Sequence, residues 1–439
     1  MAEVLVVHCV DTEGPLGGDA RRRPDGTAEF MDDWDDILVT LRELTAASFR
    51  EAHADSAGGP YRFNWFCLDF TGFRTNPKHK VTAYHDTYDR LKALPTEPDG
   101  FYWHYHIPPA SGAGDEWSDT WLSSDECDTI LARRLVERGD FPEAFRAGGT
   151  IEDEAASEWL ERVCLLDFSN RVSARSYPGA PLSDFNWFGA PMRWAPYHPA
   201  AGSFLEPGSM RRLIYRSLDL RSRVNELTQE DVDACFHEVG ETGEPLVLSY
   251  FSHDCRDMRP ETYDVCAMLA RTAERTGVPW RSCTAVEAHR RFHGLEPERL
   301  ALELEPTGEG VRVRTDREPF QREPFFAAER EDGTIVRLVP ERTGEHEWLA
   351  AGRGFRRYGA AVTSCSGDKT VRAVGPIGPE LAGTLGELFE ALTPDERHFH
   401  PHPLTREQAE RLVRAETRDV YAAVVDGGRA VGYGLLRGW

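Results

Sequence analysis

The chain has 439 residues, 40% hydrophobic and 10% aromatic, which is enough to fill the cores of roughly two or three domains and excludes a wholly disordered protein. It carries 51 Lys and Arg against 74 Asp and Glu, and the net charge of −23 argues against nucleic acid or an anionic membrane as the main partner. No apolar stretch approaches the ~20 residues of a membrane span, the first residues lack the basic region of a signal peptide, and the nine cysteines include no CxxC pair. We therefore expect a cytoplasmic protein.

The part of the chain before about residue 295 alternates between two kinds of pattern. Short apolar runs that end in Gly, Pro or acidic residues predict strands, and longer segments with apolar residues at helical spacing predict helices. In chain order, strands are expected at 3–11, 61–69, 100–107, 144–149, 163–169 and 245–254, helices at 31–54, 84–94, 125–139, 153–163 and 261–277, and a strand followed by a helix within 278–292. This alternation indicates a parallel α/β architecture, most simply a barrel.

The third expected strand contains FYWHYHIPP at 101–109, with two histidines two residues apart. Side chains at i and i+2 of a strand point to the same face, so His104 and His106 should emerge side by side at the strand's end. Pro108 and Pro109 should then turn the chain into a loop. Two adjacent imidazoles are suitable ligands for one metal ion.

Other polar residues follow strands in the same way. Asp11 and Glu13 close the first strand, Arg146 lies near the end of the fourth, and His253 and Asp254 end the run at 245–254. In parallel α/β folds the carboxyl ends of the strands meet at one edge, where functional residues collect. The sequence therefore predicts one site at that edge.

These residues belong to motifs that resemble those of the NodB-type polysaccharide deacetylases, and the resemblance covers about residues 1–295. The motifs, in the family's order, are CVDTEGP (9–15), HYH (104–106), FRAGG (145–149) and LSYFSHD (248–254). The resemblance implies a distorted (β/α) barrel that removes N-acetyl or related acyl groups from sugars with one divalent metal ion, commonly zinc. Two features depart from the family pattern: Thr12 separates Asp11 from Glu13, and the two histidines are two residues apart instead of four.

The resemblance also implies the roles of the site residues. The set consists of the metal ligands Glu13, His104 and His106, the general base Asp11, its partner Arg146 and the general acid His253. Amide hydrolysis at neutral pH needs an activated water, and these residue types can supply it. A metal ion with two imidazoles and one carboxylate leaves a position open for water, a second carboxylate accepts the water's proton, and an imidazole protonates the leaving amine. Asp11 and Glu13 could exchange roles.

The segment at 183–199 is rich in aromatic residues that follow neither helical nor strand spacing. Exposed aromatic rings stack on the apolar faces of sugars, so Trp187, Trp194 and Tyr197 are candidates for a substrate-binding wall. The alternative is a long loop packed on the barrel.

Beyond about Leu295 the pattern changes. Alternating apolar and polar residues between Gly and Pro turns predict a small β-rich unit at 296–375. The remainder, 376–439, resembles the first half of a GNAT-superfamily acetyltransferase without its pyrophosphate-binding loop, so no acetyl-CoA site is implied. Its hairpin at 420–439 has an apolar outer strand, which the rest of such a domain or a second subunit of a homo-oligomer would cover. We thus expect three parts, of which residues 1–295 form the barrel.

The sequence as a whole predicts a metal-dependent hydrolase, with Zn²⁺ as the expected ion, that removes an acetyl-type group from an amino-sugar or similar small amide. Its partner would be that small molecule. One alternative is a non-catalytic carbohydrate-binding or scaffold protein, and another is an acyl-transfer protein acting through the GNAT-like part. A stoichiometric metal ion that is lost when His104 and His106 are substituted would favour the hydrolase, and acetyl-CoA binding would favour acyl transfer.

Overall fold

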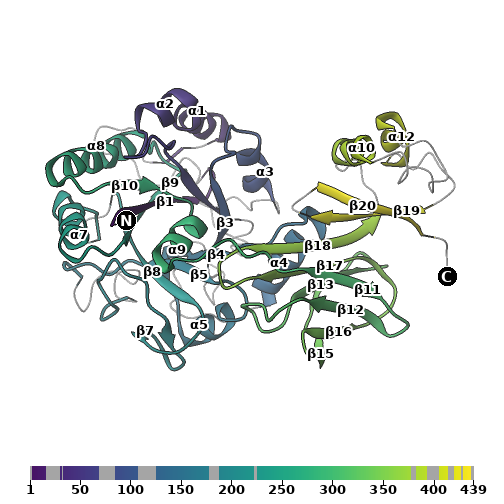
Figure 1. Ribbon diagram of the computed structural model, residues 1–439. Coiled ribbons are helices and arrows are strands. Elements are labelled where there is room, and N and C mark those ends of the chain that lie inside the picture. The colour runs from purple at the N-terminus through teal and green to yellow at the C-terminus, as the bar shows by residue number, and fades with distance from the viewer. Residues whose placement is uncertain are drawn as a thin grey trace. The chain divides into compact units, whose positions relative to one another are not determined.

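Figure 1 shows a computed structural model of the chain. It describes residues 2–15, 30–31, 33–68, 85–106, 125–176, 187–221, 225–376, 382–392, 405–413, 420–426 and 429–436. The chain divides into two compact units. The first consists of Met1–Ser124 and Pro142–Pro297, and the second of Asp125–Phe141 and Glu298–Trp439.

The first unit is built on a closed barrel of parallel strands, as the sequence predicts. In order around the barrel these are β1 (Val4–Thr12), β2 (Phe63–Leu68), β3 (Gly100–Tyr105), β4 (Ala144–Ala147), β5 (Leu166–Asn170), β8 (Leu213–Asp219) and β9 (Leu246–His253). The barrel closes because β9 pairs back with β1 from Val4 to Asp11. A short strand, β10 (Trp280–Ser282), pairs with the first residues of β1, on the edge that β2 occupies further along.

Alternation along β1 determines which residues face the barrel interior. Val4, Val6 and Val10 belong to the apolar core that the strands share with surrounding helices. Successive side chains of a strand point to opposite faces, so Cys9 and Asp11 face the other way, into the barrel. The apolar residues of β1 thus pack on the outside of the barrel, and the carboxylate of Asp11 lies inside its C-terminal end.

The helices of the first unit lie outside the barrel, as Figure 1 shows for α1, α2, α7 and α8. They are α1 (Trp34–Thr45), α2 (Ala47–Ala52), α3 (Asp86–Lys92), α5 (Glu154–Leu160), α7 (Gln229–Thr242), α8 (Arg259–Thr276) and α9 (Ala285–His293). The helix expected at 31–54 is divided at Ala46, whose backbone is extended. Thr228 and Thr284 begin α7 and α9 with capping boxes. No helix of the described residues is long and apolar enough to cross a membrane.

The connection from β5 to β8 contains no helix among the described residues of 171–212. Instead it has the aromatic segment and a small hairpin of β6 (Pro199–Ala200) and β7 (Ser203–Pro207). The backbone of the segment pairs with two barrel strands: Tyr197 pairs with Ile214 of β8, and the N–H of Val247 in β9 donates to the backbone oxygen of Trp194 at 3.0 Å. Aromatic side chains of this segment therefore pack against these two strands.

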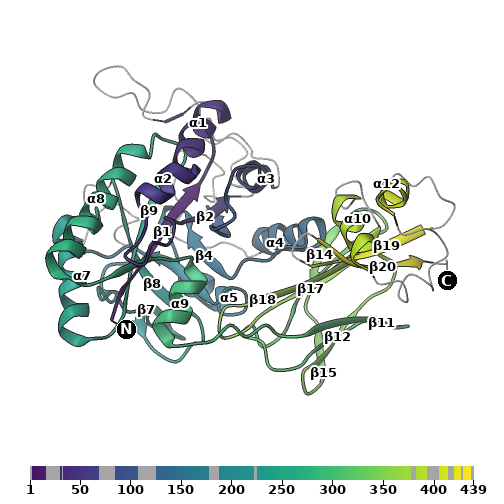
Figure 2. The same ribbon diagram turned by 45° about the horizontal axis from the view of Figure 1, so that its top comes forward.

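The second unit contains two antiparallel sheets. One has the order β11 (Leu302–Pro306), β12 (Gly310–Thr315), β16 (Glu347–Ala351) and β15 (Glu341–Gly344), and the other β14 (Ile335–Leu338), β13 (Phe325–Arg330), β17 (Phe355–Thr363), β18 (Lys369–Pro376), β19 (Val420–Asp426) and β20 (Arg429–Leu436). Val313 and Trp348 of the first sheet share a core with Phe326 and Val362 of the second. Helices α10 (Ala382–Ala391) and α12 (Arg406–Val413) lie together beside β19 and β20 (Figure 2).

Helix α4 (Asp125–Arg138) lies between β3 and β4 in the sequence but packs in the second unit. The guanidinium of Arg337 in β14 donates to Asp128 at 2.7 Å, and the ring of Phe141 lies 4.9 Å from that of Phe325 in β13. The second unit is therefore discontinuous in sequence. It also joins the expected parts 296–375 and 376–439 in one sheet, because β18 pairs with β19.

Candidate metal centre

Strand register brings four of the six predicted site residues together at the C-terminal end of the barrel. Asp11 of β1 lies opposite His253 of β9, and His104 of β3 lies opposite Arg146 of β4. Three of them are nearly inaccessible, whereas His253 has 21% of its side chain exposed. His253 is therefore the member of this group that solvent reaches most easily.

The other two, Glu13 and His106, each follow the end of their strand by one residue and complete a cluster with His104. The ligand atoms of these three buried side chains lie within 4.8 Å of one another. His106 Nε2 is 3.1 Å and His104 Nε2 is 3.9 Å from Glu13 Oε1, and the two imidazole centroids are 4.9 Å apart. The same-face prediction for the two histidines thus holds, and the cluster can bind a metal ion. Pro108 and Pro109 lie outside the described residues.

The hydrogen bonding of His104 prepares it as a ligand. Its Nδ1 lies 3.0 Å from the backbone oxygen of Arg146, which can only accept, so Nδ1 carries the hydrogen and Nε2 of the neutral ring is unprotonated. That Nε2 is buried and has no hydrogen-bond partner among the described residues. A lone pair directed at the carboxylate of Glu13 is unfavourable unless a cation lies between them. The donor set therefore fits a metal ion.

Electrostatics around the cluster agree with that fit. Burial lowers the pKa of His104, but Asp11 and Glu13 outweigh burial and raise it above its ordinary value. Burial raises the pKa of Glu13, yet His106 and His104 hold that pKa well below the usual range. The two carboxylates thus attract a proton or a cation to this point, and a bound metal ion would displace the proton.

The turn after β4 packs closely against His106. A Cβ atom on Gly148 would lie 2.4 Å from Cγ of His106, so only glycine lets the two segments approach this closely. Gly149 and Thr150 then take positive φ values of 58° and 57°. Gly148 of the FRAGG motif is therefore part of the site, for which the sequence alone offers no reason.

Asp11 is held by Arg146 rather than by the histidines. Nε and Nη2 of Arg146 donate to the two carboxylate oxygens at 2.6 and 3.0 Å, and Nη1 donates to the backbone oxygen of Phe168. The guanidinium also lies 3.9 Å from the ring centroid of Phe251. Burial raises the pKa of Asp11, but Arg146 and His104 outweigh burial, so Asp11 is ionised at neutral pH.

His253 completes the arrangement on the opposite side of Asp11. Its Nε2 lies 3.9 Å from Oδ2 of Asp11. Burial, followed by the positive charge of Arg256, lowers the pKa of His253. The imidazole is therefore mainly neutral at neutral pH and can exchange a proton with its surroundings.

Asp254 had no predicted role, but its carboxylate contacts the backbone of Glu13, a member of the candidate ligand cluster. One of its carboxylate oxygens accepts the N–H of Glu13 at 2.7 Å and that of Gly14 at 3.1 Å. Burial raises the pKa of Asp254 to about 7, and these N–H groups oppose that rise. The sequence shows a carboxylate directly after His253, which could have marked Asp254 as a site residue. Its partners, Glu13 and Gly14, are brought near it only by the pairing of β1 with β9.

The aromatic residues expected as a substrate wall are buried instead. Trp187 is fully buried, with its indole N–H donating to the backbone oxygen of Thr150 at 2.5 Å. Tyr197 packs in the same small core and donates its hydroxyl to the backbone oxygen of Phe204, while Trp194 packs under the guanidinium of Arg216. These rings cover the barrel as core side chains, so the expectation of exposed stacking surfaces does not hold.

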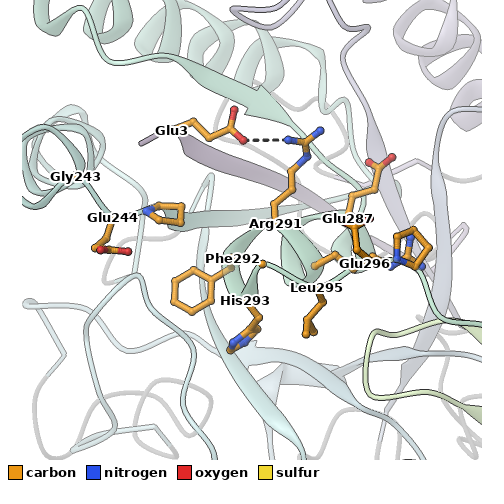
Figure 3. A pocket seen from close by; sticks show the side chains of 13 residues that line it. Glu3, Gly243, Glu244, Glu287, Arg291, Phe292, His293, Leu295 and Glu296 are labelled. Carbon is orange, nitrogen blue, oxygen red and sulfur yellow. Dashed lines mark hydrogen bonds and ion pairs between the residues drawn. The ribbon is translucent and has the colours of Figure 1, made fainter. Parts of the chain in front are cut away.

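A cavity of about 730 Å³ lies at the other end of the strands (Figure 3). It is lined by Glu3 before β1, by Gly243–Pro245 before β9 and by the last turn of α9, where Arg291 donates to Glu3 at 3.1 Å. None of the six predicted site residues lines it. The candidate chemistry therefore belongs to the C-terminal end of the barrel and not to this cavity.

No model of a known protein family matches the chain, and no curated protein matches it. The function of the site is therefore inferred from its own geometry.

Proposed function

We propose that this protein is a metal-dependent hydrolase that removes an acyl group from the nitrogen of an amino-sugar or similar small amide. One observation carries the proposal: the buried cluster of two imidazoles and one carboxylate lies beside a second carboxylate fixed by an arginine and flanked by a third imidazole. The order of the motifs, which resembles that of NodB-type deacetylases, supports the same reaction.

Glu13, His104 and His106 would hold the ion, and their nitrogen and oxygen donors suit Zn²⁺. When bound, such an ion lowers the pKa of a water molecule and polarises the acyl oxygen. The geometry favours Glu13 over Asp11 as the third ligand. Glu13 approaches both imidazoles, whereas both carboxylate oxygens of Asp11 already accept hydrogen bonds from Arg146.

Asp11 would accept the proton of the attacking water. Its lowered pKa keeps it ionised at neutral pH, and Arg146 fixes the plane of its carboxylate. Oδ1 lies 3.8 Å from Nδ1 of His104, so the proposed base lies directly beside a proposed metal ligand.

His253 would deliver a proton to the leaving nitrogen. It is mainly neutral at neutral pH and therefore needs a proton before it can act as an acid. Asp11 lies 3.9 Å away on the same face, so the proton taken from water can pass to His253 and then to the amine. The partial exposure of His253 leaves it accessible to a substrate.

The carbohydrate-binding alternative loses its main support because Trp187, Trp194 and Tyr197 are buried. A binding protein also has no need for a buried, charge-rich cluster, which costs stability unless it serves another purpose. For acyl transfer, the described residues of the second unit offer no observation that favours it.

The proposal is tested by metal analysis and by release of free amine from a panel of N-acetylated amino-sugars and small amides. The wild-type protein should contain one metal ion per chain and release amine, and His106→Ala should lose both. His237→Ala, an exposed histidine of α7, is the control for loss of an imidazole. A His106→Ala protein with unchanged metal content would reject the ligand assignment, and metal-loaded protein that releases no amine from any panel member would reject the reaction.

A further inference from the structure

The ligand Glu13 lies beyond the end of its strand ladder. The last residue of β1 that pairs with β2 is Thr12, opposite Cys67. Among the described residues Glu13 therefore has no strand partner that fixes its backbone, although its side chain must meet two imidazoles. Some other contact has to hold it in place.

Asp254 supplies that contact. The residue is 1% exposed. Its Oδ1 accepts the N–H groups of Glu13 at 2.7 Å and Gly14 at 3.1 Å, and Oδ2 lies 3.3 Å from the same Gly14 nitrogen. In return, the backbone N–H of Asp254 donates to the backbone oxygen of Asp11 at 3.3 Å. The end of β9 and the end of β1 are therefore joined in both directions.

The conformation of Gly14 is fitted to this contact. Its φ is +70°, and a Cβ atom there would lie 2.8 Å from the ring of Trp34. Only glycine takes this left-handed turn against a neighbouring ring without strain. The turn directs two successive N–H groups toward one carboxylate, an arrangement that binds anions.

We propose that Asp254 is a positioning residue that fixes the metal ligand Glu13 and thereby sets the affinity of the site for its ion. This inference rests on the proposed function, because it takes Glu13 as a ligand. Asp254 acts through the backbone and does not enter the cluster itself. Because it follows His253 directly, the same dipeptide also fixes the ligand relative to the proposed acid.

Loss of a group that orients a metal ligand typically costs about 10–100-fold in metal affinity. Asp254→Ala should therefore bind metal about 10–100-fold more weakly. Asp254→Asn keeps a side-chain oxygen that accepts both N–H groups, so its affinity should change by less than about threefold. A role limited to general stability would instead lower the unfolding midpoint and leave the metal affinity of the folded protein unchanged.

The experiment titrates metal-free wild-type, Asp254→Ala and Asp254→Asn proteins with Zn²⁺ against a competing chelator, with unfolding curves measured alongside. Asp264→Ala, an exposed aspartate of α8, is the matched control. Added Zn²⁺ should restore part of the amine release of Asp254→Ala. Should that variant not fold, Asp254→Glu replaces it, since one extra methylene group must displace the turn at Gly14 and weaken Zn²⁺ binding in the same way.

Three results would overturn the inference or its basis, and they are distinguishable. Equal Zn²⁺ affinity of wild type and Asp254→Ala (or its Glu replacement) rejects the positioning role alone. An Asn variant as weak as the Ala variant rejects the hydrogen-bond account of that role. A wild-type protein that binds no Zn²⁺ rejects the proposed function from which the inference starts.

Discussion

The guanidinium of Arg146 donates to both carboxylate oxygens of Asp11, at 2.6 Å from Nε and 3.0 Å from Nη2. The backbone oxygen of the same arginine accepts the Nδ1 hydrogen of His104 at 3.0 Å. One residue of β4 therefore orients both the proposed base and a proposed ligand. This double role explains why the arginine is fully buried although it carries a charge.

Asp11→Asn and Glu13→Gln should have opposite effects on metal content. Asp11→Asn should keep the ion and lose about 10²–10⁴-fold in rate, because it removes a general base and leaves the three ligands in place. Glu13→Gln should lose the ion. Metal analysis with single-turnover rates checks both, and an Asp11→Asn protein without metal would mean that the two acids have exchanged roles.

Gly148→Ala should weaken the site by overpacking. Its Cβ would lie 2.4 Å from Cγ and 2.6 Å from Cα of His106, so either the histidine or the turn must shift. The expected cost is about 1–3 kcal/mol in the free energy of unfolding, together with weaker metal binding. Gly202→Ala is the control, since nothing lies within 4 Å of its added Cβ. Equal metal affinity of the two variants would show that the turn does not support His106.

Much of the barrel could be predicted because the outer face of most strands is apolar by itself. β8 was missed, since LIYRSLD places Arg216 and Ser217 inside an apolar run. In the fold, Arg216 stacks over the ring of Trp194 and Ser217 accepts a hydrogen bond from Ser249 at 3.0 Å. Both polar residues find these partners in segments distant in the sequence, so the pattern of one segment could not reveal a strand.

The candidate site likewise has features that the sequence predicts and features that it does not. The shared face of His104 and His106 is a local property of a strand, so the sequence alone predicts it. The hydrogen bonds of Asp254 to Glu13 and the approach of Gly148 to His106 depend on register between distant strands, and no local pattern encodes them. The helical pattern at 125–138 likewise showed that α4 has an apolar face but not that a sheet of the second unit covers it.

Stability of the second unit should depend on pH through Asp140, which follows α4. It accepts hydrogen bonds from Arg134 at 2.9 Å and from Lys369 of β18 at 2.7 Å. Burial raises the pKa of Asp140, but Lys369 and Arg134 outweigh burial and hold that pKa far below its ordinary value. Its contribution is therefore present above the unfolded pKa of about 4 and is lost as the pH falls below it toward the folded pKa.

Asp140→Asn should accordingly destabilise the protein by about 3–5 kcal/mol at pH 7, because it removes the negative charge that both cations contact. The difference from wild type should shrink as the pH falls below about 4. Denaturant unfolding of both proteins between neutral and acidic pH checks this. A difference that stays constant over that range would show that the charge of Asp140 contributes nothing.

The last prediction concerns the dependence of α4 on the strands that cover it in the second unit. This helix contacts β13, β14, β17 and β18, and its Ile130, Leu131 and Leu135 are fully buried. Removing residues 298–439 takes away all four strands, and each apolar side chain of α4 that becomes exposed costs about 1.5–3 kcal/mol. The fragment 1–297 should therefore unfold at a lower temperature than the full chain and bind a hydrophobic dye. The fragment 1–376, which keeps the four strands, is the control and should retain the cover of α4. A monomeric 1–297 fragment that unfolds at the same temperature as the full chain and binds no dye would show that α4 does not need these strands.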